Sequence, residues 1–297
     1  LRKAIYCRGA GIEPLLDGAE WNFHDEETQP HLHALHPYPA RFIPQLPRKA
    51  ILAWSKPGDV ILDPFCGCGT TLLESILMGR PSIGVDNNAV AHLISTAKTA
   101  RYTRADLRRL QRFVSEVPFR IATEPPSDVW MPDPEKLTFW FDEGAMLDLG
   151  RLKGLIDQLP KRPRLLALAV FSSIIVSVSY QDSDTRYTKI TRPYPPGDVE
   201  KKFLAKLTDA ISRAEAILDL PRAEATLYLD DTRHLIQIPS ESIALIVTSP
   251  PYLNAYDYHK YHRQRLHWID GDIELARDCE IGKHDVFTRP NAKPDAY

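Results

Sequence analysis

The segment "GDVILDPFCGCGTTLLESILMG", residues 58–79, constrains the fold of this chain more than any other stretch. Its opening "DVILD" has the nearly continuous apolar pattern of a strand that is buried on both faces of a parallel sheet. A loop with two glycines follows, and "TTLLESILMG" has helical spacing that ends at Gly79. A second strand and helix, "PSIGVDNN" and "AVAHLISTAKTARY", come directly after it. Two such units predict an α/β fold with a doubly wound parallel sheet.

The middle of the chain interrupts this alternation. It contains amphipathic helical patterns and two polar stretches that we interpret as loops, "EPPSDVWMPDPEK" and "YQDSDTRYTKITRPYPPGDV". Strand patterns return in "ATLYLDD" and "IALIVTSPPY". We therefore predict three parts. Residues 1–100, irregular at the start, form the first half of the α/β domain, residues 101–222 form a mostly helical insertion, and residues 223–297 form the second half.

The end of the chain fits this fold poorly. A complete sheet of this type needs about three more strands after residue 252, yet residues 269–297 contain no convincing strand pattern, and residues 274–297 have the composition of a loop. A half-sheet would expose an apolar edge that favours dimerisation or aggregation. We therefore expect that C-terminal strands are missing, because the chain is truncated or because a second polypeptide or a second copy completes the sheet.

Composition limits the class of protein. Hydrophobic residues make up 43% and charged residues 26% of the 297 residues, which is typical of a soluble globular protein. No apolar run approaches the ~20 residues of a membrane span, and the start lacks a signal-peptide core. Four cysteines (Cys7, Cys66, Cys68 and Cys279) are too few for a disulfide framework in a chain of this length. We predict a cytoplasmic protein with no membrane contact. The formal net charge of −2 neither supports nor excludes a nucleic-acid site.

The glycine loop "DPFCGCGTT" has the features of a ligand site. It lies at the carboxyl end of the first predicted strand, where open α/β sheets bind ligands. Gly67 and Gly69 allow the backbone to approach a ligand closely, and the next helix directs its N-terminus toward it. Asp63 can bind a cationic amino group, and Asp86, at the end of the next strand, can accept hydrogen bonds from ribose hydroxyls. The spacing fits neither a P-loop nor a dinucleotide fingerprint.

A second segment, "TSPPYL" at residues 248–253, follows an apolar strand. Two consecutive prolines cannot donate backbone hydrogen bonds, so they end the strand and stiffen the loop. The Ser249 hydroxyl and the Pro250 carbonyl can accept hydrogen bonds, and Tyr252 offers a flat face for stacking. The alternative is an ordinary rigid turn in which Tyr252 only packs.

These segments together resemble the amino-methylating DNA methyltransferases. "DPFCGCGTT" is similar to their S-adenosylmethionine loop, "TSPPY" to their catalytic motif, and "HPYPARFIP" (residues 36–44) to the upstream segment that completes the methionine pocket. The resemblance covers about residues 31–100 and 224–268. It implies a Rossmann-like class I methyltransferase fold, S-adenosylmethionine as cofactor, and double-stranded DNA as partner in a restriction–modification or defence system.

The resemblance also implies roles for individual residues. The base-holding residues are Ser249, Pro250, Pro251 and Tyr252, and the cofactor-binding residues are Phe42, Asp63, Pro64, Phe65, Gly67, Gly69, Thr70, Asp86 and Asp231. Asp231 or its neighbour Asp230 would bind the adenine amino group, although such an acid can equally cap the next turn. An exocyclic amine must be flipped from the duplex before it can be methylated. Carbon-5 cytosine methylation would need a Pro-Cys motif, which this chain lacks.

Alternatives to this reading remain open. Serine at the first position of the "SPPY" motif favours cytosine N4 as the target, and adenine N6 is the alternative. An enzyme of the same fold could methylate an RNA amine such as guanine N2, and a non-catalytic DNA-binding subunit of a modification system is a third hypothesis.

Several basic and histidine-rich segments are candidates for contacts with nucleic acid or metal. The candidate DNA contacts are Arg186, Lys189 and Arg192 in one polar loop, Lys260, Arg263 and Arg265 after the catalytic loop, and Arg101, Arg104, Arg108, Arg109 and Arg112 on one predicted helix. A solvated basic face is the alternative for the helix, and an ordinary loop for the first group. His31, His33 and His36 lack a fourth ligand, so we expect a solvated loop and no metal. The insertion is the candidate recognition region; a lid or a dimer surface is the alternative.

Overall fold

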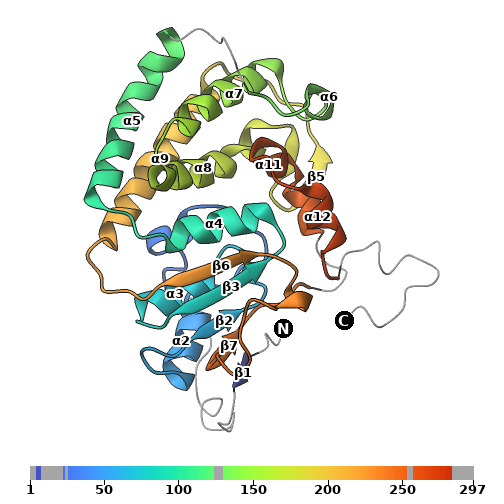
Figure 1. Cartoon of the computed structure of the whole chain (residues 1–297). Coiled ribbons are helices and arrows are strands. Elements are labelled where there is room, and N and C mark those ends of the chain that lie inside the picture. Colours follow the sequence, from blue (N-terminus) through green and yellow to red (C-terminus); the bar gives the residue numbers. More distant parts are fainter. Residues whose placement is uncertain (1–4, 8–22, 24–25, 124–129, 253–256, 283–297) are drawn as a thin grey trace, which may run out of the picture.

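A central parallel sheet organises the molecule (Figure 1). The computed structural model describes residues 5–7, 23, 26–123, 130–252 and 257–282. The sheet has the strand order β1–β7–β2–β3–β6. Strands β7, β2, β3 and β6 are parallel, and β1 pairs antiparallel with β7. The bounds are β1 (Ile5–Cys7), β2 (Ile61–Asp63), β3 (Ser82–Asp86), β6 (Ala225–Leu229) and β7 (Leu245–Val247). The predicted α/β fold with a parallel, Rossmann-like sheet is confirmed.

The register of the strands brings their carboxyl ends together. Leu62 of β2 is paired with Ile83 of β3 on one side and with Ile246 of β7 on the other. Asp63 therefore ends β2 beside the first residues that follow β7, and Asp86 ends β3 on the other side. Because all four parallel strands end at this edge, residues that are far apart in the sequence converge there.

Three helices cover one face of the sheet: α2 (Gln45–Trp54), α3 (Thr70–Leu77) and α4 (Ala89–Thr99). Helix α3 is buried almost all round, and its polar residues Thr70, Thr71, Glu74 and Ser75 are buried together with its apolar ones. Asn88 caps the start of helix α4, because its side chain accepts a hydrogen bond from Val90 N at 2.9 Å. The start of α3 packs so closely on α4 that a Cβ atom at Gly69 would lie 2.7 Å from Ser95 Cβ.

A layer of helices lies on the other side of α4 from the sheet (Figure 1). It contains α5 (Arg104–Thr123), α7 (Glu143–Asp157), α8 (Lys161–Ile174) and α9 (Asp198–Ala216), with the short α6 (Pro134–Leu137). Helix α5 buries Leu107, Leu110, Phe113 and Val117, a helical spacing that turns its arginines outward. One cluster of buried apolar side chains joins this layer to α3 and α4. The predicted helical insertion is confirmed, and its exact boundaries stay a prediction.

Some segments differ from the sequence-based expectation. The polar stretch after α8, predicted as a loop, contains a hairpin of β4 (Gln181–Ser183) and β5 (Arg186–Lys189). Its two-residue turn lacks the Asn-Gly or Gly pattern that usually marks such a hairpin. The irregular start contains β1, which is too short for a strand pattern to be recognised. The loop predicted around residues 124–136 includes the start of α6, and residues 124–129 lie outside the described residues.

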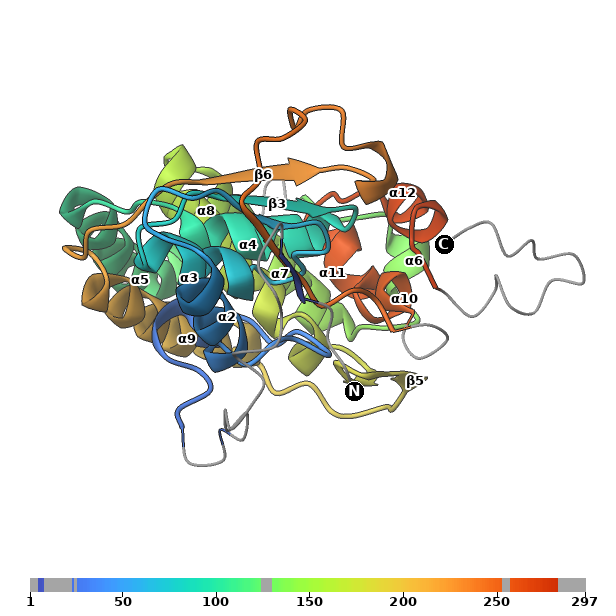
Figure 2. The same cartoon turned by 90° about the horizontal axis from the view of Figure 1, so that it is seen from below.

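The chain after β7 folds into three short helices beside the carboxyl edge of the sheet (Figure 2). They are α10 (Tyr258–Tyr261), α11 (Arg263–Trp268) and α12 (Ile273–Asp278). The prediction of a loop was wrong for α12, which begins where Asp272 Oδ1 accepts a hydrogen bond from Leu275 N at 2.8 Å. No strand follows β7 in the part described up to residue 282. Single 3-10 turns are η1 (His31–Ala34), η2 (Val176–Val178) and η3 (Thr232–His234).

Among the helices of the described residues, none is both long and apolar enough to cross a bilayer.

Candidate functional site

A pocket opens at the carboxyl edge of the sheet and collects residues from most of the predicted motifs. About 870 Å³ of empty space, open solvent at the mouth included, lies between the residues that line it. The predicted site residues that line it are Phe42, Asp63, Pro64, Phe65, Gly67, Thr70, Asp86, Asp231, Ser249 and Pro251. The pocket therefore joins the upstream segment, the glycine loop and the catalytic loop.

Asp63 lies at the base of this pocket with only 2% of its surface exposed. Its Oδ1 accepts hydrogen bonds from Thr248 Oγ1 at 2.7 Å and from Phe65 N at 3.2 Å. Burial raises the pKa of Asp63 to about 6, although the hydroxyls of Thr248 and Thr71 and the amide of Phe65 oppose that effect. These two hydrogen bonds use Oδ1, and a carboxylate has further lone pairs, those of Oδ2 included, that can accept from a ligand. A buried carboxylate of this kind favours a cationic partner.

Asp86 fixes the shape of the glycine loop. Its Oδ2 accepts a hydrogen bond from Gly67 N and its Oδ1 one from Asn88 N, both at 2.9 Å. Burial raises its pKa to about 6, and the amides of Asn88 and Gly67 oppose the effect. Gly67 has φ +48°, and a Cβ atom there would lie 3.2 Å from the Tyr38 ring. Each Asp86 oxygen keeps a second lone pair that can accept from a ligand hydroxyl.

The upstream segment forms a wall of the pocket. The Tyr38 ring stacks on His262 of the segment after the catalytic loop, with centroids 4.9 Å apart and an interplanar angle of 27°. The Arg41 Nη1 atom donates to the His33 carbonyl at 2.9 Å, which holds the turn together. Phe42 is buried and contributes to the same wall. The segment is therefore clamped between the sheet and the C-terminal helices.

The acids after β6 are partly occupied by their own neighbours. The Asp231 carboxylate caps η3 through Arg233 N at 2.9 Å and pairs with the Arg233 guanidinium, which lowers its pKa. The Asp230 Oδ2 atom accepts from Gln237 Nε2 at 2.6 Å. Both acids line the pocket. The capping alternative is thus realised, and contact of Asp231 with an adenine amino group stays a prediction.

The catalytic loop reaches the pocket through part of its motif. Ser249 and Pro251 line it, whereas Pro250 is exposed and Tyr252 is half-buried outside the lining. Gly69, another predicted site residue, also stays outside the lining and packs against α4. Residues 253–256 lie outside the described residues; they include Tyr256, an aromatic residue of the candidate DNA-contact segment after the catalytic loop.

Sequence reasoning missed several lining residues. They are Tyr38, Arg41, Asn88, Thr232, Tyr258, Ala276, Cys279, Glu280 and Ile281, among others. Glu280 accepts hydrogen bonds from Tyr258 N at 2.6 Å and from His259 N at 3.0 Å, which folds the segment after α12 against α10. No pattern in the sequence marked these C-terminal residues, because their place depends on the fold-back of three short helices.

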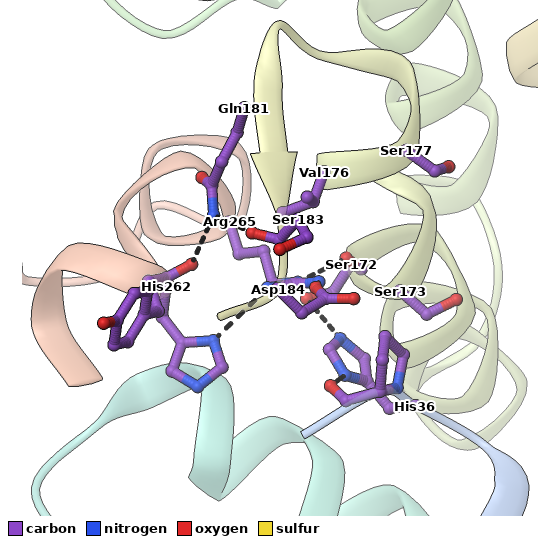
Figure 3. A network of polar contacts seen from close by, with 12 residues as sticks. His36, Ser172, Ser173, Val176, Ser177, Gln181, Ser183, Asp184, His262 and Arg265 are labelled. Atoms are coloured by element: carbon purple, nitrogen blue, oxygen red, sulfur yellow. Dashed lines mark hydrogen bonds and ion pairs between the residues drawn. The ribbon is translucent and has the colours of Figure 1, made fainter. Parts of the chain in front are cut away.

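One predicted DNA contact was wrong. Arg265 is completely buried, and its guanidinium bonds the Ser172 carbonyl through Nε at 3.0 Å and the Asp184 carboxylate through Nη2 (Figure 3). The Ser172 hydroxyl also bonds His36 Nε2 at 3.1 Å. The network ties the hairpin turn, α8, α11 and the upstream segment together. From the sequence alone, a charged side chain is expected to be exposed. The burial of Arg265 depends on partners that are distant in the sequence, so it could not be predicted.

Two of the three candidate histidines, His33 and His36, are also buried, not solvated as expected. His33 Nε2 lies 2.8 Å from Glu74 Oε1, and burial lowers the pKa of His33 to about 4. His36 makes the contacts in the Arg265 network, and burial lowers its pKa well below the usual value. These histidines therefore hold the upstream segment to α3 and α8. The described residues contain no group of three or more His, Cys, Asp or Glu side chains arranged to hold a metal ion.

The other basic candidates have different surroundings. Arg186 and Arg263 are exposed, and Arg186 pairs with Asp182 at 3.3 Å. The ammonium of Lys189 lies 4.1 Å from the centre of the Phe139 ring. Arg192 Nη2 donates to the Gln181 carbonyl at 2.7 Å, and Lys260 Nζ lies 2.6 Å from Asp257 Oδ2.

The basic face of α5 lies away from the pocket. Figure 1 places α5 on the side of the helical layer opposite to α11 and α12. Arg108, Arg109 and Arg112 are exposed there, and Arg104 pairs with Asp219.

Comparison with known proteins agrees with this arrangement. Residues 16–97 match the sequence pattern of the N6/N4 methyltransferase family, which is described as DNA methylase. Over this part, which contains the upstream segment and the glycine loop, the chain is similar to this family of DNA methylases. It is 37% identical over 93 residues to the type II methyltransferase M.MjaII of Methanocaldococcus jannaschii, which covers 31% of this chain and 17% of the relative. It is 25% identical over 279 residues to the type II methyltransferase M.MvaI of Kocuria varians, which covers 85% of this chain and 60% of the relative.

Another relative carries a different name. A tRNA (guanine(10)-N2)-dimethyltransferase of Methanocaldococcus jannaschii is 33% identical over 115 residues, 34% of this chain and 32% of the relative. The chain spans less than two thirds of the length of the type II methyltransferases that it matches, at 17%, 60% and 49%. No solved structure shows a significant match.

Proposed function

We propose that this chain binds S-adenosylmethionine in the pocket and methylates an exocyclic amine of a base flipped out of duplex DNA. Cytosine N4 is the favoured target, and adenine N6 is the alternative. One observation carries the proposal: Asp63 and Asp86, which end two adjacent strands, line the same pocket as Ser249 and Pro251 of the "SPPY" loop. A methyl donor and an acceptor base would meet there.

The pocket suits this cofactor in charge and shape. S-adenosylmethionine would supply an electrophilic methyl group on a positively charged sulfur. The Asp63 carboxylate would accept hydrogen bonds from its amino group, and Asp86 would accept from the ribose hydroxyls. Gly67 lies in the loop between them, where a Cβ atom would press on the Tyr38 ring, so glycine lets the loop backbone keep its close approach to the pocket. Phe42 and Phe65 would contact the methionine end.

On the base side, the task is to hold a weak nucleophile. The lone pair of an exocyclic amine is delocalised into the ring, so its hydrogens must be held while the lone pair is aligned with the methyl group. The Ser249 hydroxyl and the Pro250 carbonyl would accept those hydrogens, and Tyr252 would stack on the base. Pro250 and Pro251 stiffen the loop, which keeps the geometry fixed before the base arrives. Serine at this place in the motif supports cytosine N4.

Transfer of a labelled methyl group from S-adenosylmethionine to mixed-sequence duplex DNA, followed by nucleoside analysis, tests this function. We expect N4-methylcytosine; N6-methyladenine would keep the reaction and change the target. Ser249→Ala and Tyr252→Ala should lower transfer at least tenfold. Ser242→Ala removes an exposed serine hydroxyl that bonds the Pro239 carbonyl at 2.7 Å, so it is the matched control. Full activity of Ser249→Ala would contradict the proposed role of the loop.

RNA is the second candidate substrate. The likeness to a relative named as a tRNA (guanine(10)-N2)-dimethyltransferase supports it over about a third of the chain. Competition between transfer RNA and duplex DNA for methyl transfer separates the two, because the true substrate would suppress methylation of the other. Binding of DNA without binding of S-adenosylmethionine would instead support a non-catalytic subunit of a modification system.

We further propose that DNA phosphates contact the hairpin and the segment after the catalytic loop. Arg186, Lys189 and Arg263 are exposed, so they are the main candidates, with Arg192 and Lys260 as half-buried neighbours. Arg186→Gln and Arg263→Gln should weaken binding of duplex DNA and reduce its salt dependence, whereas Arg112→Gln on α5 should change neither. Unchanged salt dependence in both variants would contradict this surface.

The biological setting is also a proposal. The relatives named type II methyltransferases support a place in a restriction–modification system. Residues 101–222 are proposed as the recognition region. Association with a second copy or another polypeptide stays a prediction, which sedimentation of the chain with and without DNA would test.

A further inference from the structure

Thr248 connects the cofactor side of the pocket to the catalytic loop. It follows β7 directly and precedes Ser249, and 5% of its surface is exposed. Its Oγ1 donates a hydrogen bond of 2.7 Å to Asp63 Oδ1. Strands β7 and β2 are adjacent and parallel, so this bond crosses between the ends of two neighbouring strands. Thr248 itself does not line the pocket.

We infer that Thr248 is a positioning residue, which holds the Asp63 carboxylate with Oδ2 toward the ammonium group of an α-amino acid ligand and ties it to the Ser249 loop. This inference rests on the proposed function, because the ligand is the amino acid end of S-adenosylmethionine or its demethylated product.

The hydrogen bonds at Asp63 show how the residue would act. A carboxylate can rotate about its Cβ–Cγ bond, and two donors on Oδ1, Thr248 Oγ1 and Phe65 N, fix that rotation. The bond from Thr248 is the shorter of the two, and Thr248 directly follows β7, the strand that leads into the catalytic loop. Donation to Oδ1 also stabilises the ionised form, which is the form that attracts an ammonium group. Loss of the Thr248 hydroxyl should therefore weaken ligand binding most at the pH values at which Asp63 is only partly ionised.

The groups around Asp63 allow a clear test of pH dependence. The titratable groups that face it are Asp86 from β3 and the Cys66 thiol of the glycine loop. Helix α3 contributes the Thr71 hydroxyl and strand β7 that of Thr248. Burial already raises the pKa of Asp63 to about 6. Removing one donor should raise this pKa further, so that Asp63 ionises about one pH unit higher.

The test measures binding of S-adenosylhomocysteine, which keeps the α-amino acid and the ribose but has no methyl group to transfer. Calorimetric titrations from pH 5.5 to 8.5 compare wild type with Thr248→Val, which has the same shape without the hydroxyl. Protonation of the ligand itself affects both proteins equally, so the ratio of the two dissociation constants at each pH is free of that effect. We expect Thr248→Val to bind about tenfold more weakly at pH 5.5 and less than threefold more weakly at pH 8.5.

Two further variants control for packing. Thr248→Ser restores the hydroxyl and should bind within about twofold of wild type. Thr99→Val removes a buried hydroxyl of α4 that bonds the Ser95 carbonyl at 2.9 Å, outside the pocket, and should leave binding unchanged. A loss of affinity that is equal at every pH, or that serine does not restore, would mean that Thr248 only packs and would overturn the inference.

The same experiment separates this inference from the proposed function. If wild type binds the ligand and the ratio is flat with pH, the inference fails alone. If wild type does not bind the ligand at any pH, the proposed function fails and the inference fails with it.

Discussion

Replacing Asp63 by asparagine is expected to stabilise the ligand-free fold while it removes affinity for a cationic ligand. Asparagine keeps the carbonyl oxygen that accepts from Thr248 and Phe65. It removes the charge whose burial raises the pKa of Asp63 from 3.8 to about 6. A difference of this size corresponds to about 3 kcal/mol of stability at neutral pH.

The sign of the effect follows from proton linkage. The folded state binds the Asp63 proton more tightly than the unfolded state, so the stability of the wild type falls as pH rises from 3.8 to about 6 and is constant above. Asp86 acts in the same direction over the same window. The advantage of Asp63→Asn should therefore be about 1 kcal/mol at pH 4.5 and about 3 kcal/mol at pH 7.5.

Urea unfolding of both proteins at these two pH values measures the difference. Asp219→Asn is the control, because 75% of the Asp219 side chain is exposed in its ion pair with Arg104, and its effect should stay within about 0.5 kcal/mol. The reasoning is refuted if Asp63→Asn is no more stable than wild type at pH 7.5, or if its gain is the same at pH 4.5.

Other predictions concern packing. Gly69→Ala should cost about 3 kcal/mol, because φ is +74° and the new Cβ would clash with α4. Gly197→Ala, with φ +78° and open space around it, should cost only about 1 kcal/mol; equal losses in chemical unfolding would argue against the clash. Asp184→Asn should cost about 1–3 kcal/mol, because it leaves Arg265 buried without its ionic partner. Thr185→Ala, in the same exposed turn, should be nearly neutral in the same assay, and an equal loss in both variants would contradict the importance of the ion pair.

The sequence predicted the part of the molecule that depends on local pattern. Strand β2 has a continuous apolar run and β3 follows it as the next strand of the same alternation. Parallel strands place their last residues at one edge, so the convergence of Asp63 and Asp86 could be expected. The motif residues Phe42 and Ser249 also line the pocket. Their part in the site could be predicted because they belong to motifs that resemble those of a known family.

The sequence could not predict features that depend on distant partners. Arg265 and His36 are polar in sequence, and they are buried only because Ser172 and Asp184 satisfy them. Glu280 reaches the pocket only because α10, α11 and α12 fold back beside the sheet. None of these three helices is long enough to give a strong helical periodicity in the sequence. The hairpin β4–β5 has a turn without glycine, so its composition resembled that of a loop.

The hydrophobic cluster shared by the helical layer and the α/β layer has a consequence for engineering. Leu73, Ile76 and Ala97 from α3 and α4, together with Trp268 from α11, belong to the same buried cluster as α5, α7, α8 and α9. A chimaera that exchanges residues 101–222 with those of a relative would place foreign side chains against these four. A chimaera in which the facing residues of α3, α4 and α11 are also taken from the relative should fold. A chimaera in which only residues 101–222 are exchanged would have mismatched side chains at this contact.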